Sequence, residues 1–336
     1  LKIPKSLMKF TWASFRDTDR VIVPIRFAFA SHTPLKGYCK VPVDVSEAVE
    51  AAHLSLRDWV DAYDPELVIA LGPDHFNGFF YNVMPPFCIG MESEAVGDWN
   101  TPAGHLRSAQ EIALNLLSFA HKSGVDLAAS YSMKIDHGLS QFLNELFTWD
   151  SMPPVIPVFL NCAAPPRPPL QRVLELGRLI GVFAKTLDLR ILVTASGGLS
   201  HDPPIPLLSE ATGELRNRLI HGGKLSAEAR ESRQNRVVEE ANKQIQGVSV
   251  RIPLNPEWDR SFIESIQRFD FDPILSMNDE QMTNDAGCGV HEVRTWLSVA
   301  AAAQESGAKS LELLLYLPIP EWVAGYAIMK GVGADY

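Results

Sequence analysis

Four histidines of this chain each come directly after an apolar run of the kind that forms a β-strand. They are His32 after IRFAFAS, His75 after ELVIALGPD, His137 after DLAASYSMKID and His201 after RILVTASGGLS. Ligands of α/β sheets bind along the edge where the carboxyl ends of parallel strands lie, so we expect the four imidazoles to meet at that edge. Four imidazoles at one edge indicate a metal site or an acid–base site.

Three acidic residues and one amide stand where they could complete such a site. Asp74 and Asp136 each directly precede a histidine, and each could either orient an imidazole or cap its own loop. Glu292 opens the predicted helical segment VHEVRTW, where it could be a metal ligand or an ordinary acidic residue of a first helical turn. Asn77, in the segment PDHFNG, is a further candidate for contacts around the metal or in a substrate pocket.

The residue types narrow the chemistry. A histidine-rich site with few cysteines can hold zinc, iron, manganese or copper. Two histidines and one carboxylate with open coordination positions form the ligand set of non-haem Fe(II) oxygenases, whereas the same residues could hold zinc in a hydrolase. The other histidines fall in predicted helices or polar loops, and we expect them to be structural or exposed: His53, His105, His121 and His221.

The histidines need a sheet that brings the strand ends together, and the apolar pattern predicts one. The run ELVIALG at 66–72 is apolar throughout, as in a strand buried on both faces of a parallel sheet. The preceding segment 45–63 has apolar residues at helical spacing, among them Val49, Leu56 and Val60. The alternation continues with helices near 107–123, 139–148 and 170–187 and strands at 154–161 and 190–196. It predicts an α/β fold with a central, mostly parallel sheet flanked by helices.

The same pattern predicts the domain organisation. Residues 1–24 have no clear pattern and are predicted to be an N-terminal extension, and residues 25–336 to be a single catalytic domain. Residues 256–305 contain several short predicted helices, so the C-terminal part is expected to be helical. The aromatic, proline-bearing segment 76–106 is longer than a usual connection and is predicted to form a wall of a pocket.

The composition argues against several classes of function. The chain has 336 residues and a formal net charge of −10 without a basic stripe, so we expect no nucleic-acid partner. No apolar run approaches the length of a membrane span, and the four cysteines follow no disulfide or zinc pattern, so we expect a cytoplasmic protein without a membrane partner. The patterns GxGxxG, GxxxxGK[ST] and GxSxG are absent, which argues against nucleotide binding and against a hydrolase with a serine at a strand-to-helix turn.

Several segments of the chain resemble the class III extradiol ring-cleaving dioxygenases. The similarity covers about residues 25–330, and the string PDHFNGFFYNVMPPF is long and specific. The segments that carry it are ASHTPL, LGPDHFNGFFYNVMPPFCIG, YSMKIDHG, SGGLSH, NPEWD, HEVRTW and IPEW. The resemblance implies extradiol (meta) cleavage of a catechol by O₂ at a non-haem Fe(II) site. The expected reaction opens 2,3-dihydroxyphenylpropionate to a 2-hydroxy-6-oxo-dienedioate.

The resemblance also implies a role for each candidate residue. His32, His75 and Glu292 match the iron ligands of the family. His201 matches the histidine that acts as base toward a catechol hydroxyl, and His137 matches the proton donor of later steps. Such enzymes are commonly homo-oligomers, so we expect a homo-oligomer as well.

Two alternatives remain open at the level of the sequence. The same chemistry could act on another catechol or on an aminophenol, because no pattern identifies the residues that contact the ring substituent. A relative that binds metal without oxygenase activity would lack a ligand or an acid–base histidine, and all five expected residues are present. If the substrate carries a carboxylate, Lys36, Lys134 and Arg294 are candidate partners for it.

Overall fold

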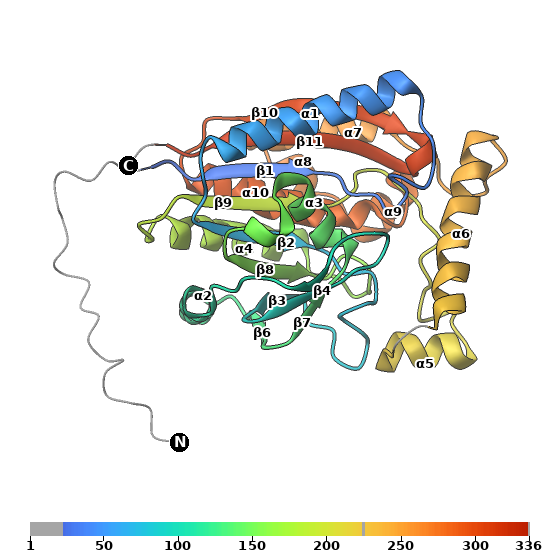
Figure 1. The fold of residues 1–336 in the computed structure, drawn as a ribbon, viewed down its shortest axis with the longest axis horizontal. Coiled ribbons are helices and arrows are strands. Elements are labelled where there is room, and N and C mark those ends of the chain that lie inside the picture. The colour runs from blue at the N-terminus through green and yellow to red at the C-terminus, as the bar shows by residue number, and fades with distance from the viewer. Residues whose placement is uncertain (1–22, 224–225, 335–336) are drawn as a thin grey trace.

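The computed structural model describes residues 23–223 and 226–334, so residues 1–22 of the predicted N-terminal extension lie outside the described residues. An eight-stranded sheet forms its centre, and a three-stranded sheet accompanies it (Figure 1). The strands are β1 Arg26–Ala30, β2 Leu67–Gly72, β3 Phe87–Gly90, β4 Ser93–Val96, β5 Ala103–His105, β6 Ala128–Ser130, β7 Met133–Ile135, β8 Val155–Leu160, β9 Ile191–Ser196, β10 Leu311–Ile319 and β11 Ala324–Val332.

The large sheet brings strands from distant parts of the chain side by side. Its order is β10-β11-β1-β9-β2-β8-β3-β6, and the central strands β1, β9, β2 and β8 are parallel neighbours. Antiparallel pairs lie toward the edges, between β1 and β11, β10 and β11, and β3 and β8. The register pairs Ala30 with Ser196 and Leu71 with Ala195. The segments that follow β1, β9 and β2 therefore leave the sheet at the same edge.

The central strands are apolar throughout because both faces of the sheet are covered. In β2, Leu67, Ile69 and Leu71 belong to one buried cluster, whereas Val68 and Ala70 belong to another. Successive side chains of a strand point to opposite faces, so the two clusters are the two cores of one sheet. The predicted α/β fold with its helix-flanked sheet is confirmed.

Helices cover both faces of the sheet, and further helices follow β9 (Figure 1). They are α1 Val43–Asp61, α2 Gln110–Lys122, α3 His137–Leu146, α4 Leu170–Ala184, α5 Gly213–His221, α6 Ala227–Ile245, α7 Pro256–Gln267, α8 Asp272–Leu275, α9 Asp279–Ala286 and α10 Val293–Glu305, with single 3₁₀ turns η2 Trp149–Ser151, η3 Val290–Glu292 and η4 Pro320–Trp322. Helices α4 and α10 pack together on one face, and α1 and α3 lie on the other. The expected helical C-terminal part is present.

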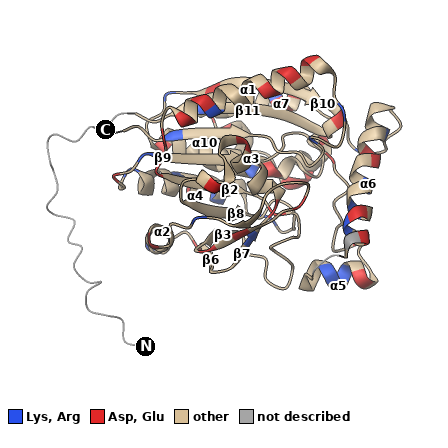
Figure 2. Ribbon diagram, viewed as in Figure 1, with Lys and Arg blue, Asp and Glu red and all other residues tan. Residues whose placement is uncertain are grey.

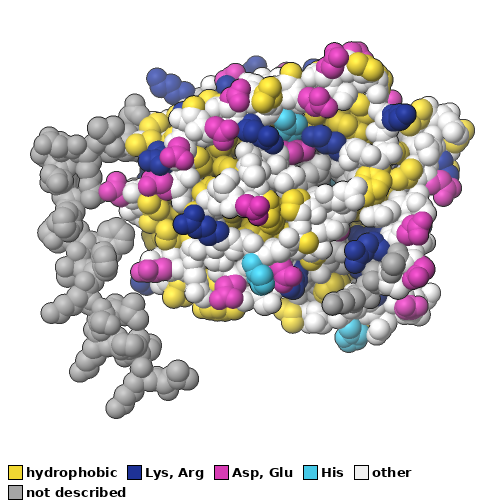
Figure 3. Space-filling model, viewed as in Figure 1, with side chains coloured by type: hydrophobic (Ala, Val, Ile, Leu, Met, Phe, Trp, Pro, Cys, Tyr) yellow, Lys and Arg dark blue, Asp and Glu magenta, His cyan; other side chains and the backbone are white. Residues whose placement is uncertain are grey.

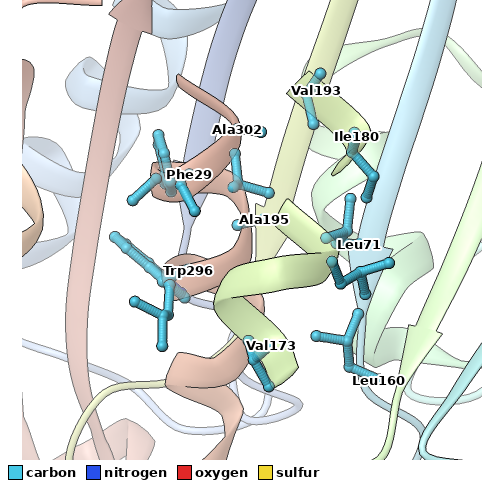
Figure 4. Packing of buried hydrophobic residues seen from close by; sticks show 14 of the residues in the cluster. Phe29, Leu71, Leu160, Val173, Ile180, Val193, Ala195, Trp296 and Ala302 are labelled. Carbon is cyan, nitrogen blue, oxygen red and sulfur yellow. The ribbon is translucent and has the colours of Figure 1, made fainter. Parts of the chain in front are cut away.

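Helix α1 shows how the sequence pattern selects the buried face. Val49, Leu56 and Val60 are buried as predicted from their spacing, and the helix packs against β10 and β11. On the opposite face of the sheet, Trp296 of α10 lies beside Phe29 of β1 (Figure 4), with ring centroids 5.5 Å apart. This packing fixes the position of α10 relative to the strand ends.

Two segments differ from the sequence-based expectation. The run before His137 is not one strand of the main sheet, because it divides into β6 at the edge of the large sheet and β7 in the sheet β5-β4-β7. The segment 76–106 is not an uninterrupted loop, since it contains β3, β4 and β5. Short strands with mixed exposure give a weak period-2 signal, which explains why the sequence pattern did not reveal them.

Helices α5 and α6 stand together at one end of the molecule (Figure 1). Hydrogen bonds from Arg218 of α5 to Phe76 O and from Arg233 of α6 to His75 O hold them over the segment that follows β2. Acidic and basic residues are interspersed along the ribbon (Figure 2), and their side chains are interspersed on the visible face of the space-filling view (Figure 3). Within residues 23–223 and 226–334, none of the helices has the length and apolar character needed to cross a membrane.

Candidate active site

The carboxylate of Glu292 lies among three of the four predicted histidines. Glu292 Oε1 is 3.1 Å from His75 Nε2 and 3.5 Å from His201 Nε2. Glu292 Oε2 is 3.4 Å from His32 Nε2. The fourth histidine, His137, stacks on His75 with ring centroids 4.3 Å apart. The structure thus gathers all four histidines and Glu292 in one place.

The elements that deliver these histidines are not all equivalent. His32 follows β1, His75 follows β2 and His201 follows β9, which are adjacent strands of the large sheet. His137 instead opens α3 after β7, a strand of the small sheet. The expectation that all four follow equivalent strands of one sheet is therefore wrong for His137, which reaches the site from the start of a helix.

Helix α10 delivers Glu292 from the far end of the sequence. The indole Nε1 of Trp296 donates a hydrogen bond to Gly197 O at 2.8 Å, which fastens the first turn of α10 to the end of β9. Gly198 N donates to Glu292 Oε2 at 2.7 Å. These bonds hold the Glu292 carboxylate beside the segment that leads to His201.

The separations around Glu292 fit the coordination sphere of one divalent ion. Two nitrogen or oxygen ligands at right angles are about 3 Å apart when each lies about 2.1 Å from the ion. The contacts of Glu292 with His75 and His32, at 3.1 and 3.4 Å, are close to that value. Each imidazole is therefore separated from Glu292 by about the distance between two ligands of one ion, through a different carboxylate oxygen in each case.

Two sets of side chains without Glu292 have ligand atoms close enough to share an ion. The ligand atoms of His32, His75 and His137 lie within 4.8 Å of one another, as do those of Asp98, Asp136 and His137. In the second set both carboxylates already accept hydrogen bonds, Asp98 from the His137 backbone and Asp136 from the His75 backbone, each at 2.8 Å. These acids are better described as partners of imidazoles than as ligands.

Asp136 orients His75 rather than the histidine that follows it in sequence. Its Oδ2 accepts from His75 N at 2.8 Å and lies 3.2 Å from His75 Nδ1. Asn77 Nδ2 donates to the same oxygen at 2.8 Å. A carboxylate at Nδ1 fixes the proton there and leaves Nε2 free to face Glu292. The backbone at Gly138 approaches so closely that a Cβ would lie 2.8 Å from the His75 ring, so a side chain at this position would displace the imidazole.

Asp74 caps its own loop. Its carboxylate accepts backbone hydrogen bonds from Asn77 at 3.1 Å, Gly78 at 2.8 Å and Phe79 at 3.0 Å. Burial, reinforced by the nearby Asp136 carboxylate, raises the pKa of Asp74 to about 7. The contacts favour loop capping for Asp74. Asp136 does both: one oxygen orients His75, and the other accepts from Gly138 N at 2.9 Å as the N-cap of α3.

Asp98 holds His137, although no sequence pattern singled it out. One Asp98 oxygen accepts from His137 N at 2.8 Å, and the other lies 2.6 Å from His137 Nδ1. Asp98 belongs to the turn between β4 and β5, in the segment GDWN. An acid in a turn has no periodic signal, and only the approach of this turn to α3 reveals its role.

His201 and His32 are each fixed by a contact of Nδ1. His201 Nδ1 lies 2.8 Å from Leu199 O, and since a carbonyl only accepts, Nδ1 carries a proton and Nε2 is the ring nitrogen on the Glu292 side. His32 Nδ1 contacts Ser196 Oγ at 3.1 Å. Both Nε2 atoms therefore face Glu292.

The charges of the site favour an added cation. Burial lowers the pKa of His32 to about 3, so its imidazole is neutral and available as a ligand. Burial alone would also lower the pKa of His75, but Asp136 and Glu292 outweigh it and raise that pKa well above its usual value. Glu292 similarly outweighs burial at His201 and raises its pKa. The buried carboxylates thus attract positive charge to the imidazoles, and a metal ion would satisfy the same demand.

A cavity of about 110 Å³ opens over these side chains. One buried water needs roughly 10–15 Å³ of such a cavity, so there is room here for a small organic molecule. Trp99 and Phe76 line it, so the segment 76–106 does form part of a pocket wall, as predicted. Arg218 and Arg233 line it as well, and no sequence pattern singled out either of them.

The fold and this site define a class of protein, and the family comparison agrees with it. Residues 26–327 match the family model described as the catalytic LigB subunit of aromatic ring-opening dioxygenase. The chain belongs to this family and is a ring-cleaving dioxygenase. The resemblance noted from the sequence motifs is confirmed.

Curated relatives are similar over nearly their whole length. A 2,3-dihydroxyphenylpropionate/2,3-dihydroxicinnamic acid 1,2-dioxygenase of Paraburkholderia phymatum is 42% identical, over 91% of this chain and 97% of the relative. Proteins of the same name from Escherichia coli and Mycolicibacterium paratuberculosis are 42% and 41% identical, each over 89% of this chain and 96% of the relative. The solved structure of an uncharacterized protein from Escherichia coli K12 matches 92% of this chain and 100% of its own, with 14% identity and a TM-score of 0.47.

Proposed function

We propose that this chain cleaves a catechol ring by extradiol chemistry at a non-haem Fe(II) centre, with 2,3-dihydroxyphenylpropionate as the substrate. The observation that carries the proposal is the position of the Glu292 carboxylate, within 3.5 Å of the Nε2 atoms of His32, His75 and His201. The names of the relatives support the substrate. The family match over residues 26–327 supports one catalytic domain over 25–336.

His32, His75 and Glu292 would hold the iron. Their Nδ1 or backbone partners are in place, and their remaining donor atoms converge on Glu292, which supports a two-histidine, one-carboxylate facial site. Bound there, Fe(II) would keep positions open for the catechol and O₂ and supply the electron transfer that their reaction requires. Fe(II) suits this set of imidazoles and carboxylate better than magnesium or calcium, which prefer oxygen ligands.

His201 and His137 would move protons at defined atoms. His201 keeps Nδ1–H on Leu199 O, so its Nε2 can accept a proton from a catechol hydroxyl. His137 is held at Nδ1 by Asp98, which leaves its Nε2 as the atom that returns a proton to the opening ring. General acid–base help of this kind contributes roughly 10²–10⁴-fold in rate.

One experiment tests the metal and the reaction together. Protein purified without oxygen is analysed for metal, loaded with Fe(II) or zinc, and given 2,3-dihydroxyphenylpropionate, protocatechuate, gallate or 2-aminophenol while O₂ uptake is recorded. We expect O₂ uptake only with Fe(II), and the highest kcat/KM for 2,3-dihydroxyphenylpropionate. The product should contain both atoms of O₂ and result from cleavage of the ring bond beside the diol. Full loading with Fe(II) but no O₂ uptake, or activity with zinc as a hydrolase, would reject the proposal.

Alanine variants test the two proton-transfer roles. His201→Ala and His137→Ala should lose about 10²–10⁴-fold in kcat while binding one equivalent of iron. The exposed His105, changed to alanine, is the matched control and should keep wild-type turnover. Near-normal turnover in either site variant, or loss of iron from one of them, would contradict the assigned roles.

A further inference from the structure

Three arginines line the cavity above the candidate iron site. Arg218 comes from α5, and Arg233 and Arg236 come from α6. Arg233 donates to His75 O at 2.7 Å and Arg218 donates to Phe76 O at 3.2 Å. These bonds place two guanidinium groups beside the loop that bears a proposed iron ligand, so a molecule bound at the iron can reach them.

The positive charge of these arginines is not balanced inside the cavity. Of the described residues that line it, the only acid is Glu292, whose carboxylate lies among the histidines. Asp74 interacts electrostatically with Arg218, but its carboxylate is occupied by three backbone N–H groups of its own loop. Burial and the neighbouring Arg233 both lower the pKa of Arg218, as expected for a cation without a close counter-charge.

Arg218 also has an unused donor. Its Nε atom is buried and has no hydrogen-bond partner among the described residues. A buried donor without a partner is unfavourable, so a ligand that accepts a hydrogen bond from it would recover part of that loss. Arg236 is exposed and makes a long contact of 3.5 Å with Ser232 of its own helix, so its guanidinium can also turn to a ligand.

The candidates named from the sequence have other partners. Lys36 Nζ is 2.7 Å from Glu145 Oε1, and Lys134 Nζ is paired with Glu94. Neither Lys36 nor Lys134 lines the cavity. Arg294 does not line it either, since it is fully buried and donates to Pro168 O at 3.1 Å. The candidate partners for a substrate carboxylate are therefore the arginines of α5 and α6 rather than these three residues.

We infer that Arg218, Arg233 and Arg236 bind the carboxylate of the substituent on the catechol ring and so select carboxylated catechols over neutral ones. This inference rests on the proposed function, because the diol must sit at the iron. Guanidinium groups bind carboxylates through paired N–H donors, and apolar lining from Ile205 and Val237 suits the ring and its chain. The cavity thus combines the candidate iron ligands, where a diol would bind, with arginines that can bind an anion.

The test compares a charged substrate with its neutral counterpart. In the iron-loaded enzyme, kcat/KM is measured for 3-(2,3-dihydroxyphenyl)propionate and for 3-propylcatechol. We expect the wild type to prefer the acid by about 10- to 100-fold, the range for a hydrogen bond to a charged group. Arg218→Gln and Arg236→Gln should each lower this preference mainly through the acid, with little change for 3-propylcatechol. Arg230→Gln, an exposed change on α6 outside this cavity, should leave the ratio unchanged.

A binding measurement separates this inference from the proposed reaction. 3-Phenylpropionate has no diol, and its binding to the iron-loaded protein without oxygen is followed by calorimetry, with propylbenzene as the neutral probe. We expect Arg218→Gln and Arg236→Gln to weaken 3-phenylpropionate about tenfold or more. Equal preference for acid and neutral probes in the wild type, or an unchanged ratio in both variants, would overturn the carboxylate site while catechol cleavage stands. A failure to cleave any catechol would instead reject the proposed function.

Discussion

The contact between Asp98 and His137 makes a prediction that the sequence alone could not supply. Asp98 holds His137 twice, at the backbone N at 2.8 Å and at Nδ1 at 2.6 Å, and His137 stacks on the ring of His75. In Asp98→Asn the amide oxygen can keep the backbone bond, but the amide NH₂ then faces Nδ1. Since an NH₂ group only donates, the imidazole proton must move to Nε2, and the ring loses its charged acceptor.

The size of the effect follows from that geometry. A hydrogen bond to a charged group contributes about 1.5–3 kcal/mol, so losing the charge at Nδ1 should lower kcat at least tenfold. The upper limit is the whole contribution of His137 as proton donor, roughly 10²–10⁴-fold. KM and iron content should change little, because Asp98 acts through His137 rather than on the substrate or the metal.

The assay is steady-state O₂ uptake at equal iron loading, with exposed Asp126→Asn as the matched control. The decisive measurement repeats Asp98→Asn in a His137→Ala background. Residues that act as a unit are strongly non-additive, so the second change should have little further effect on kcat. If the two losses simply add, or if Asp98→Asn keeps wild-type turnover, Asp98 does not act by positioning His137.

Three further perturbations test other parts of the structure. A Cβ at Gly289 would lie 2.1 Å from His201 Nε2, so Gly289→Ala should displace that imidazole. The expected result is a loss of about 10²-fold or more in kcat at unchanged iron content. Wild-type turnover of this variant would count against His201 as the base. A Cβ at Gly177 would lie 1.9 Å from Ser298 O, so Gly177→Ala should separate α4 from α10 and destabilise the protein by about 1–3 kcal/mol in urea unfolding, whereas Arg178→Ala on the exposed side of α4 should be nearly neutral. Burial, partly offset by Glu145, lowers the pKa of His53 to about 4. The unfolded chain therefore binds this proton first as pH falls below about 6.5, and stability should fall by about 2 kcal/mol between about pH 7 and pH 5. That loss should be smaller in His53→Gln, and an identical pH dependence would contradict the buried, neutral His53.

Much of the fold could be predicted because local patterns and tertiary packing agree. Continuous apolar runs became the buried strands β2, β8 and β9, and the spacing of Val49, Leu56 and Val60 marked the buried face of α1. Short strands at the sheet edges were harder to predict, since β6 and β7 are only three residues each and belong to different sheets. Strand pairing joins segments far apart in the chain, and no local pattern records it.

The same distinction between local pattern and tertiary packing applies to the candidate site. The residues themselves determined that imidazoles would be available where apolar runs end, and the motifs around His32, His75, His137 and His201 determined the family resemblance. Only the tertiary structure decided which atoms meet. Packing of α10 on β9 carries Glu292 to the histidines, the β4–β5 turn carries Asp98 to His137, and α5 and α6 carry Arg218 and Arg233 over the cavity. These partners are set by how elements pack across the molecule, which spacing along one chain does not encode.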